Sequence, residues 1–399
     1  MRLAPCHSHL KMSSAGGAPG GEAKNIHERS LMAKRRNNGR IALRTGSFGK
    51  GRYSQWSALV RSLGFGLRLT LTALFVALVG CHKSQTSSVL QLRLGYFPNV
   101  THAQALVGLA KGEFQKEFSL PVDFVPRVFN SGPSAIEALL ADAIDLTYVG
   151  PSPAINGFVR SQGKALRVIS GAASGGAVFV KRAGVSLGRK EDYAGKRFAA
   201  PQIGNSQDIS LRSYLNDLGY LPKEKGGNVE VLPLANPDIL MLFLRKEIDG
   251  AWVPEPWGAI LVQRGNGSVL IDERDLWPDR KFATAVLVAS KRILDERPDW
   301  VRRFLKLHVK LTRWVQENPE EAKQLINREI TRLTRKPMPE KILEEAFSRF
   351  EVTSDPIPSS LVTFFQRARR LNYIRRGDIE GLCDLRYLDE ITLNKENSD

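Results

Sequence analysis

The chain has 399 residues, of which 42% are hydrophobic and 25% are charged, an ordinary balance for a globular protein of one or two domains. Its net charge of +17 is concentrated at one end, because residues 1–80 contain 13 Lys and Arg but only 2 Asp and Glu. That segment is rich in Gly, Ser and Asn and shows no periodicity, which indicates a disordered basic extension rather than an arm that binds nucleic acid. We therefore expect no nucleic-acid partner.

A secretory signal is predicted at the end of this extension. Basic residues precede an apolar run of 11 residues, Leu69–Val79, and Gly80 and Cys81 follow it. The sequence LVGC at 78–81 resembles the bacterial lipobox, which implies acylation of Cys81 and a lipid-anchored protein on the periplasmic side of the cell envelope. An uncleaved signal anchor is the alternative, although a membrane span needs about 20 residues.

Cysteine and histidine are scarce in the predicted mature chain. The three cysteines of the sequence are Cys6, Cys81 and Cys383, so no disulfide forms once the extension is removed and Cys81 is acylated. The histidines that remain, His82, His102 and His308, lack the spacing of metal ligands. We expect neither a metal nor a cofactor.

Strand-like and helix-like segments alternate from residue 90 onward. In the first half of the mature chain, strands are predicted at residues 90–96, 121–125, 144–149 and 166–173. Helices are predicted between them, because apolar residues such as Ala103, Leu106, Val107 and Ala110 recur with the period of a helix face. This order predicts an open parallel sheet with helices on its faces.

A second, similar series follows residue 182. Its strands are predicted at residues 197–201, 229–234, 250–254 and 283–290, and helical segments follow at 299–316, 319–330 and 339–350. We therefore predict an α/β fold of two lobes joined by two crossover strands. The predicted parts are a disordered extension and signal peptide (1–80), a tether (81–89), lobe 1 (90–180 plus 283–395) and lobe 2 (181–282).

Two Gly-Pro-Ser elbows, Gly132–Ser134 and Gly150–Ser152, each stand between a predicted strand and a predicted helix, and a third helix start lies at Gly204–Asp208. Helix N-termini at the carboxyl ends of parallel strands present free N–H groups and the positive end of the helix dipole. Glycine allows close approach, proline fits the first helical turn, and serine caps the helix or donates to a ligand. Together the three starts could hold a small anion through neutral donors. The alternative is that each is only a helix cap.

Several long blocks of sequence, among them LRLGYFPNVTHAQALVGLAKGEF and FNSGPSAIEALLADAIDLTYVGPSPAINGF, closely resemble the nitrate, sulfonate and taurine group of ABC-transporter substrate-binding proteins. The resemblance covers nearly all of residues 90–375. It implies the type II periplasmic-binding-protein fold, with one ligand in a cleft between two lobes of a monomer. It also implies delivery of a small anionic or zwitterionic solute to an ABC permease and an ATPase on other chains. Aliphatic sulfonates and taurine are the first candidates, followed by nitrate and bicarbonate.

Carried over residue by residue, the resemblance implies a pocket built from both lobes. Lobe 1 would contribute Tyr96, Asn99, His102, Ser131, Gly132, Ser134, Gly150, Ser152, Ser174 and Gly175. Lobe 2 would contribute Gln202, Asn205, Ser206, Gln207, Trp252, Glu255 and Trp257. A carboxylate at Glu255 would repel an anion unless it points away or pairs with a cation. This residue leaves room for a zwitterion such as taurine, or for a heterocyclic thiamine precursor.

Alternative roles exist for several of these residues. His102 could be a surface residue at a helix start, both tryptophans could be core residues, and Asn236 and Asp238 are interpreted as caps of the following helix.

An enzyme on the same fold is the competing class. Pyrimidine-precursor synthases of thiamine biosynthesis resemble this family, and they consume a histidine and bound pyridoxal phosphate, which requires a suitably placed lysine. The elbows contain no lysine, and the predicted signal directs the chain out of the cytosol. A sensory domain is disfavoured because no membrane span or output module follows in the sequence. We therefore expect a binding protein and not an enzyme.

Overall fold

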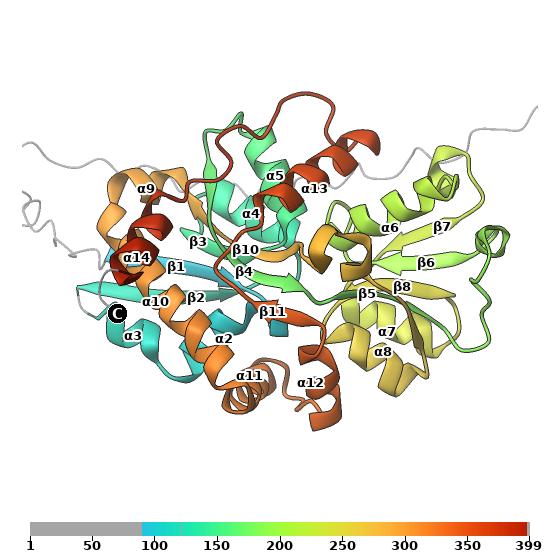
Figure 1. Cartoon of the computed structure of the whole chain (residues 1–399), viewed down its shortest axis with the longest axis horizontal. Coiled ribbons are helices and arrows are strands. Elements are labelled where there is room, and N and C mark those ends of the chain that lie inside the picture. The colour runs from blue at the N-terminus through green and yellow to red at the C-terminus, as the bar shows by residue number, and fades with distance from the viewer. Residues whose placement is uncertain (1–89, 120, 397–399) are drawn as a thin grey trace, which may run out of the picture. The chain divides into compact units, whose positions relative to one another are not determined.

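The computed structural model describes residues 90–119 and 121–396, where the strands form two sheets (Figure 1). The six-stranded sheet has the order β11 (Phe350–Val352), β4 (Leu166–Gly175), β10 (Ala283–Ser290), β3 (Leu146–Val149), β1 (Leu90–Tyr96) and β2 (Val122–Val128). The five-stranded sheet has the order β7 (Glu230–Pro233), β6 (Arg197–Ala200), β8 (Gly250–Pro254), β5 (Ala177–Lys181) and β9 (Ser268–Asp272). The predicted α/β class is confirmed.

Both sheets follow the same plan. In the first, β1 pairs in parallel with β2 and β3, while β10 runs antiparallel to β3 and β4. In the second, β6 pairs in parallel with β7 and β8, while β5 runs antiparallel to β8 and β9. Parallel neighbours need crossover connections, and in this chain helices supply them. The helices that follow parallel strands therefore begin at the carboxyl edge of their sheet.

The chain crosses from one sheet to the other twice. The first crossing lies between Gly175, which ends β4, and Ala177, which begins β5, and the second enters β10 at Ala283. Gly175 and Gly176 have φ values of 76° and 77°. A Cβ atom at Gly175 would lie 2.7 Å from the carbonyl oxygen of Arg349. Both the backbone conformation and the available space therefore require glycine at this crossing.

Helices flank the strands along the whole described chain. Before the first crossing the helices are η1 (Val100–His102), α2 (Ala103–Ala110), α3 (Glu113–Glu117), α4 (Gly132–Leu140) and α5 (Pro151–Arg160). Between the crossings they are η2 (Lys190–Tyr193), α6 (Ser206–Asp217), η3 (Lys223–Lys225), α7 (Asn236–Leu244), α8 (Trp257–Gly265), η4 (Glu273–Leu276) and η5 (Pro278–Arg280). After β10 they are α9 (Lys291–Glu296), α10 (Pro298–Glu317), α11 (Pro319–Thr334), α12 (Glu340–Phe347), α13 (Pro358–Arg370) and α14 (Arg386–Glu396).

Prolines mark the helix starts after β10, as the sequence predicts. Pro298 and Pro319 open α10 and α11, where a missing N–H costs no hydrogen bond, and Pro339 directly precedes α12. The predicted helix over residues 339–350 is wrong at its end. Helix α12 stops at Phe347, and Phe350 begins strand β11 instead.

Aromatic side chains fill the core on each side of the crossings. Beside the six-stranded sheet, the ring of Phe114 stacks on Phe124 and Phe304 at centroid distances of 4.8 and 5.3 Å. Beside the five-stranded sheet, Phe179 stacks on Trp252 at 5.4 Å. Such pairs add to the stability that burial of the rings provides.

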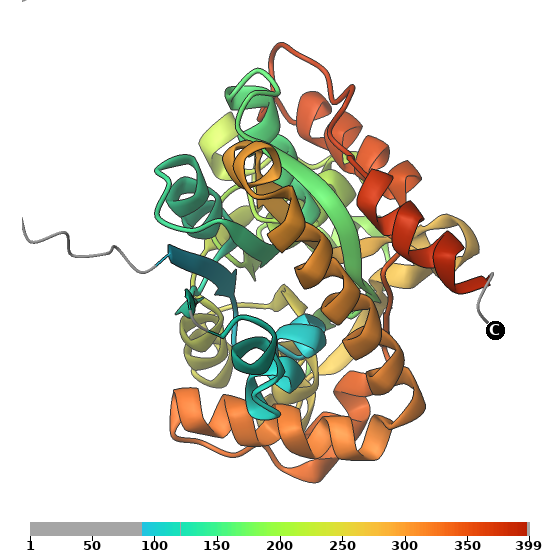
Figure 2. The ribbon, with the colours of Figure 1, turned by 90° about the vertical axis from the view of Figure 1, so that its left-hand side faces the viewer.

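The long helix α10 crosses the six-stranded sheet beside β4 (Figure 2), where the His308 Nε2 atom lies 2.9 Å from the carbonyl oxygen of Gly171. Helices α10 and α11 pack on α2, whereas α12 packs on α8 and α13 lies between α5 and α6. The C-terminal helices therefore contact helices that flank each of the two sheets.

Within residues 90–119 and 121–396, no helix is both long enough and apolar enough to cross a membrane. The predicted extension, signal, Cys81 and tether lie outside the described residues.

Candidate functional site

Helix starts from both sheets converge on a small cavity. Helix η1 follows β1, α5 follows β3, α6 follows β6 and α7 follows β7, so each begins at the carboxyl edge of its sheet. The cavity measures about 40 Å³ and is lined by Phe97, Asn99, Thr101, His102, Asn130, Gly150, Asn205, Gln207, Asn236, Pro254 and Thr284. Because one water needs about 10–15 Å³, the cavity holds roughly three water-sized groups. That volume suits the head group of a small solute.

Two glycines let the helix starts of the two sheets approach each other. A Cβ atom at Gly150 would lie 2.7 Å from the Ser206 hydroxyl oxygen, and one at Gly132 would lie 2.9 Å from Asn205 Oδ1. The backbone N–H of Ser152 donates a hydrogen bond of 3.2 Å to that Ser206 hydroxyl. The first turns of α5 and α6 are therefore in direct contact beside the cavity.

The polar atoms at these helix starts do not act as conventional caps. Ser131 and Asn205 occupy the N-cap positions of α4 and α6, and neither makes a side-chain capping hydrogen bond, while the N-cap of α5 is Gly150, which has no side chain. A capping side chain accepts an N–H bond from the first turn, and this bond is not made at the N-caps of α4 and α6.

Two buried oxygens beside the cavity have no hydrogen-bond partner within the described part of the chain. They are the hydroxyl oxygen of Ser152, on the first turn of α5, and Oδ1 of Asn236, the first residue of α7. The predicted role of Asn236 as a cap is wrong, because Ala235 holds the N-cap position. Buried polar atoms are almost always paired, and Asn236, which lines the cavity, is therefore available to a bound solute.

The amide and imidazole side chains that line the cavity are neutral. Asn99 Oδ1 accepts hydrogen bonds from the N–H and the hydroxyl of Thr101, each 3.1 Å long, which leaves the Asn99 amide nitrogen as a donor. The ring of His102 stacks on Phe97, and burial lowers the pKa of His102 to about 3. The lining residues include no Asp, Glu, Lys or Arg. Any anion held here would be bound by neutral donors and helix N-termini.

Glu255 does not line the cavity, and its charge is compensated. Its side chain is fully buried, with Oε1 2.6 Å from Arg349 Nη1 and Oε2 accepting a 2.9 Å hydrogen bond from the Ala259 N–H. Burial raises the pKa of Glu255, and the Arg349 guanidinium opposes that shift. The repulsion expected between Glu255 and an anionic solute is therefore removed by its pairing with a cation.

The structure brings together part of the predicted site. Asn99, His102, Gly150, Asn205 and Gln207 line the cavity. Gly132, Ser152 and Ser206 lie directly behind it, as the contacts described above show.

The remaining predicted site residues lie elsewhere. Ser131 and the exposed Ser134 pair with each other through their hydroxyls at 2.9 Å, and Gln202 is exposed. Ser174 and Gly175 end strand β4 at the first crossing. Tyr96, Trp252 and Trp257 belong to the hydrophobic cores, and the Trp252 indole N–H donates a 2.6 Å hydrogen bond to buried Glu273.

Several cavity residues were not predicted. They are Phe97, Thr101, Asn130, Asn236, Pro254 and Thr284. The position of Phe97 and Thr101 between the predicted Tyr96 and His102 was an available signal. The sequence around Thr284 gives no such signal. Thr284 reaches the cavity because β10 re-enters the six-stranded sheet there, and its hydroxyl donates to the Gly175 carbonyl oxygen.

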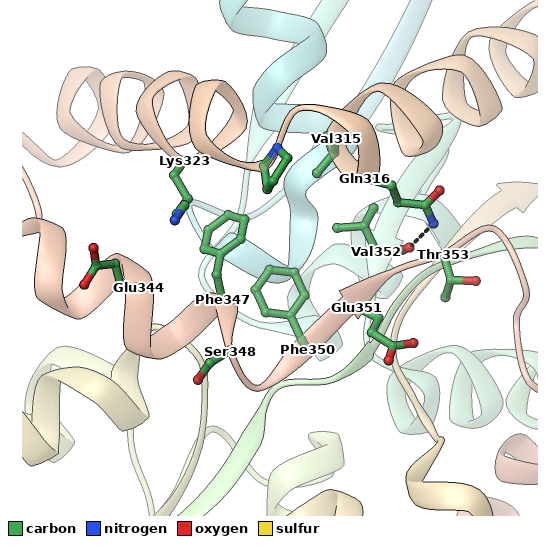
Figure 3. Close-up of a pocket in the computed structure, with 11 residues that line it drawn as sticks. Val315, Gln316, Lys323, Glu344, Phe347, Ser348, Phe350, Glu351, Val352 and Thr353 are labelled. Atoms are coloured by element: carbon green, nitrogen blue, oxygen red, sulfur yellow. Dashed lines mark hydrogen bonds between the residues drawn. The ribbon is translucent and has the colours of Figure 1, made fainter.

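A larger, open groove of about 600 Å³ lies between α10, α11, α12 and β11 (Figure 3). It is lined by Val315, Gln316, Pro319, Lys323, Glu344, Phe347, Ser348, Phe350, Glu351, Val352 and Thr353. The Gln316 side-chain N–H donates a 2.7 Å hydrogen bond to the Val352 carbonyl oxygen. Neither of the unpaired oxygens described above lines this groove, so the smaller cavity is the better candidate site.

Two curated relatives are similar to the chain over much of its length. A taurine-binding periplasmic protein of Escherichia coli is 30% identical over 203 residues, which cover 51% of this chain and 60% of that protein. A Bacillus subtilis protein named for binding aliphatic sulfonates is 25% identical over 299 residues, covering 72% of this chain and 85% of that protein. Both names describe binding proteins and not enzymes.

A solved structure shares the fold. The periplasmic nitrate-binding protein of Synechocystis PCC 6803 superimposes with a TM-score of 0.65 at 15% identity, covering 77% of this chain and 89% of that protein. The periplasmic-binding-protein fold and the resemblance to the nitrate, sulfonate and taurine group are thus confirmed. The model of the NMT1-like family matches residues 85–330, more than half of the sequence, and the chain therefore belongs to the NMT1-like family.

Proposed function

We propose that this protein is the solute-binding component of an ABC importer and that its solute is a small oxyanion or zwitterion, with taurine and short alkanesulfonates as the first candidates. The convergence of helix starts from both sheets on one small cavity without charged side chains carries the proposal. The names of the relatives from Escherichia coli and Bacillus subtilis support a sulfonate.

The donors around the cavity suit a sulfonate group. Asn99, Asn205 and Gln207 line the cavity, and the first turn of α6 begins beside it. N–H groups at helix N-termini stabilise anions because the helix dipole and the unpaired donors act together. Neutral donors of this kind bind an anion without a neighbouring cation.

The unpaired Asn236 oxygen favours a zwitterion over a simple inorganic anion. Oδ1 of Asn236 is buried, lies at the cavity and accepts no hydrogen bond from the described residues. An ammonium group on the solute would satisfy it, whereas nitrate has no donor to offer. Taurine carries both a sulfonate and an ammonium, so it matches the donors and the acceptor.

Binding would proceed by closure of the two lobes around the solute. In this proposal lobe 1 spans residues 90–180 plus 283–395, lobe 2 spans residues 181–282, and the two chain crossings act as the hinge. In this proposal the hydrogen bond between the Ser152 N–H and the Ser206 hydroxyl is one of the contacts that closure forms. Closure would present a surface made of both lobes to an ABC permease, which works with an ATPase.

We also propose that acylated Cys81 anchors the protein to a membrane on the periplasmic side of the cell envelope. The support is the sequence alone, in which a basic flank, an apolar run and LVGC precede the described residues. Mass spectrometry of the membrane fraction would detect diacylglycerol on Cys81. An unmodified chain in the soluble fraction would contradict the anchor without affecting the proposed binding activity.

A thermal-shift and calorimetric screen tests the proposed function. The panel would contain taurine, ethanesulfonate, nitrate, bicarbonate and a thiamine precursor. We expect taurine or ethanesulfonate to raise the melting temperature most, because a ligand at 100 times its Kd adds about 2.7 kcal/mol to the free energy of unfolding. Stabilisation by the thiamine precursor alone, or by none of the five compounds, would contradict the proposal.

A further inference from the structure

The two buried histidines of the described chain differ in how their ring nitrogens are bonded. In His308 both nitrogens have protein partners, with the Tyr148 hydroxyl 2.9 Å from Nδ1 and the Gly171 carbonyl oxygen 2.9 Å from Nε2. In His102 only Nδ1 has one, the backbone N–H of Phe97 at 3.2 Å. Within the described residues no hydrogen bond is found for His102 Nε2, although the residue is 97% buried and lines the cavity, its exposed fraction being 3%.

The Phe97 N–H decides which nitrogen of His102 carries the proton. A backbone N–H only donates, so Nδ1 must present its lone pair to it, and the proton of the neutral ring then lies on Nε2. The stacking of the ring on Phe97, with centroids 4.6 Å apart, further restricts its orientation. His102 therefore keeps one N–H for which the described residues offer no acceptor.

The surroundings keep this ring neutral. Burial lowers the pKa of His102 to about 3, and no charged group contributes to that shift. The titratable neighbour is Tyr148, whose ring centroid lies 5.9 Å away and whose pKa burial raises well above its usual value. Neither group changes charge between pH 5 and 8, on general grounds of titration.

We infer that His102 determines the specificity of the site: its Nε2–H donates a hydrogen bond to an oxygen of the bound solute, as a neutral donor held in a single tautomer. This inference rests on the proposed function, because it assigns the donor that recognises the oxyanion. It also assigns a solute class, since a molecule without an acceptor at that position would leave a buried N–H unpaired. Recognition by a neutral donor makes the affinity independent of pH across the range in which bacteria live.

Two substitutions at His102 distinguish the roles of its two ring nitrogens. A glutamine side chain places its amide nitrogen near the position of Nε2, whereas an asparagine amide reaches only the position of Nδ1. We expect His102→Asn to weaken taurine or ethanesulfonate binding by about 10- to 100-fold, since a hydrogen bond to a charged group is lost. His102→Gln should bind within a few-fold of the wild type, and the wild-type Kd should not change between pH 5.5 and 8.

His308→Gln is the matched control. This histidine is buried in the same way, but both of its nitrogens are bonded inside the protein, so the variant should lower the melting temperature and leave Kd unchanged. If His102→Asn binds the sulfonates as tightly as the wild type, His102 is not the donor, and the proposed function stands without it. A Kd that rises steeply above pH 6.5 would show a charged imidazole and would also overturn the inference.

Spectra of the free protein test the ring without any solute. Two-bond ¹H–¹⁵N spectra of histidine-labelled protein, assigned with the His102→Gln variant, should show the proton of His102 on Nε2 at pH 7 and no titration between pH 5 and 8. A proton on Nδ1, or titration near pH 6.5, would overturn the inference whichever solute the protein binds. The spectra could show the proton on Nε2 while none of the sulfonates binds. In that case the proposed solute class is wrong, and the inferred hydrogen bond from His102 to the solute is wrong with it.

Discussion

The two hollows of this protein differ in size and in chemistry. The groove between α10, α11, α12 and β11 is wide and open, and Lys323, Glu344 and Glu351 place both signs of charge around its aromatic floor. The cavity between the helix starts has a volume of about 40 Å³, compared with about 600 Å³ for the groove, and none of its lining residues is charged. Among the described residues, the unpaired buried oxygen of Asn236 lines the small cavity, whereas no unpaired buried oxygen belongs to a residue that lines the groove.

This difference shows that buried polar atoms without hydrogen-bond partners, rather than the volume of the hollow, identify the candidate site. Charged side chains in an open groove are solvated and need no ligand, and surface ion pairs contribute little to stability. Lys323, for example, already pairs with Glu320 at 2.6 Å. A buried donor or acceptor without a partner costs free energy that a solute can recover.

Filling the cavity with a larger side chain should have the largest effect on the affinity for taurine. Gly150→Val adds a side chain whose Cβ would stand 2.7 Å from the Ser206 hydroxyl, so it should block closure and weaken taurine binding by more than about 100-fold, or about 3 kcal/mol. Isothermal calorimetry measures this change, and Gln207→Ala offers a milder variant if the first misfolds. The matched variant in the groove is Lys323→Ala, for which we expect no change. Weaker binding by the groove variant alone would reverse the assignment.

Breaking the Glu255–Arg349 pair should affect stability and spare binding. Glu255→Gln leaves the guanidinium of Arg349 without its buried partner, and loss of one member of such a pair costs about 3 kcal/mol. The remaining contact of Arg349 with Glu345, at 2.6 Å, limits the loss. Urea unfolding gives the free energy, with Glu351→Gln on the groove as the control. Tighter binding of taurine by Glu255→Gln would instead place this carboxylate in the site.

Removing the unpaired hydroxyl should have a moderate effect on affinity alone. If Ser152 serves the solute, Ser152→Ala weakens binding by about 1 kcal/mol, close to 5-fold, and leaves the free energy of unfolding nearly unchanged. Ser134→Ala is the control, because that hydroxyl is exposed and pairs with Ser131. Equal affinities for the wild type and both variants would show that the second elbow does not bind the solute through its serine.

The pH dependence of stability tests the two buried histidines without any solute. Burial lowers the pKa of His102 to about 3 and of His308 to about 4, below the value of about 6.5 in an unfolded chain. The unfolded state therefore binds more protons, so the stability they contribute is complete above pH 6.5 and is lost as pH falls toward 4. Between pH 6.5 and 5, His308→Gln should flatten the decline seen by urea unfolding. A slope equal to that of the wild type would contradict the buried neutral ring.

The sequence predicted local features of the site better than its assembly. Gly150 and Asn205 were identified because strand, glycine and helix start are neighbours in the chain, and that local order is a signal of position. The pairing of Glu255 with Arg349 joins residues 94 positions apart and has no local signal. Asn236 looked like a cap because its side chain type caps helices, and only its position inside α7 shows otherwise.

The packing of the two tryptophans also distinguishes between the roles that the sequence left open for them, contact with a solute or a place in the core. Trp252 and Trp257 have the same chemistry, but Trp252 on strand β8 is fully buried, whereas Trp257 on helix α8 is partly buried and packs against the core. The boundaries of the two lobes and the lipid anchor at Cys81 stay predictions.

A crystal structure of the protein with taurine would test the central claim most directly. We predict sulfonate oxygens within hydrogen-bond distance of His102 Nε2 and of the amides of Asn99, Asn205 and Gln207, with the taurine ammonium near Asn236 Oδ1. Taurine bound beside Lys323 in the open groove, with the small cavity still closed over water, would contradict the account.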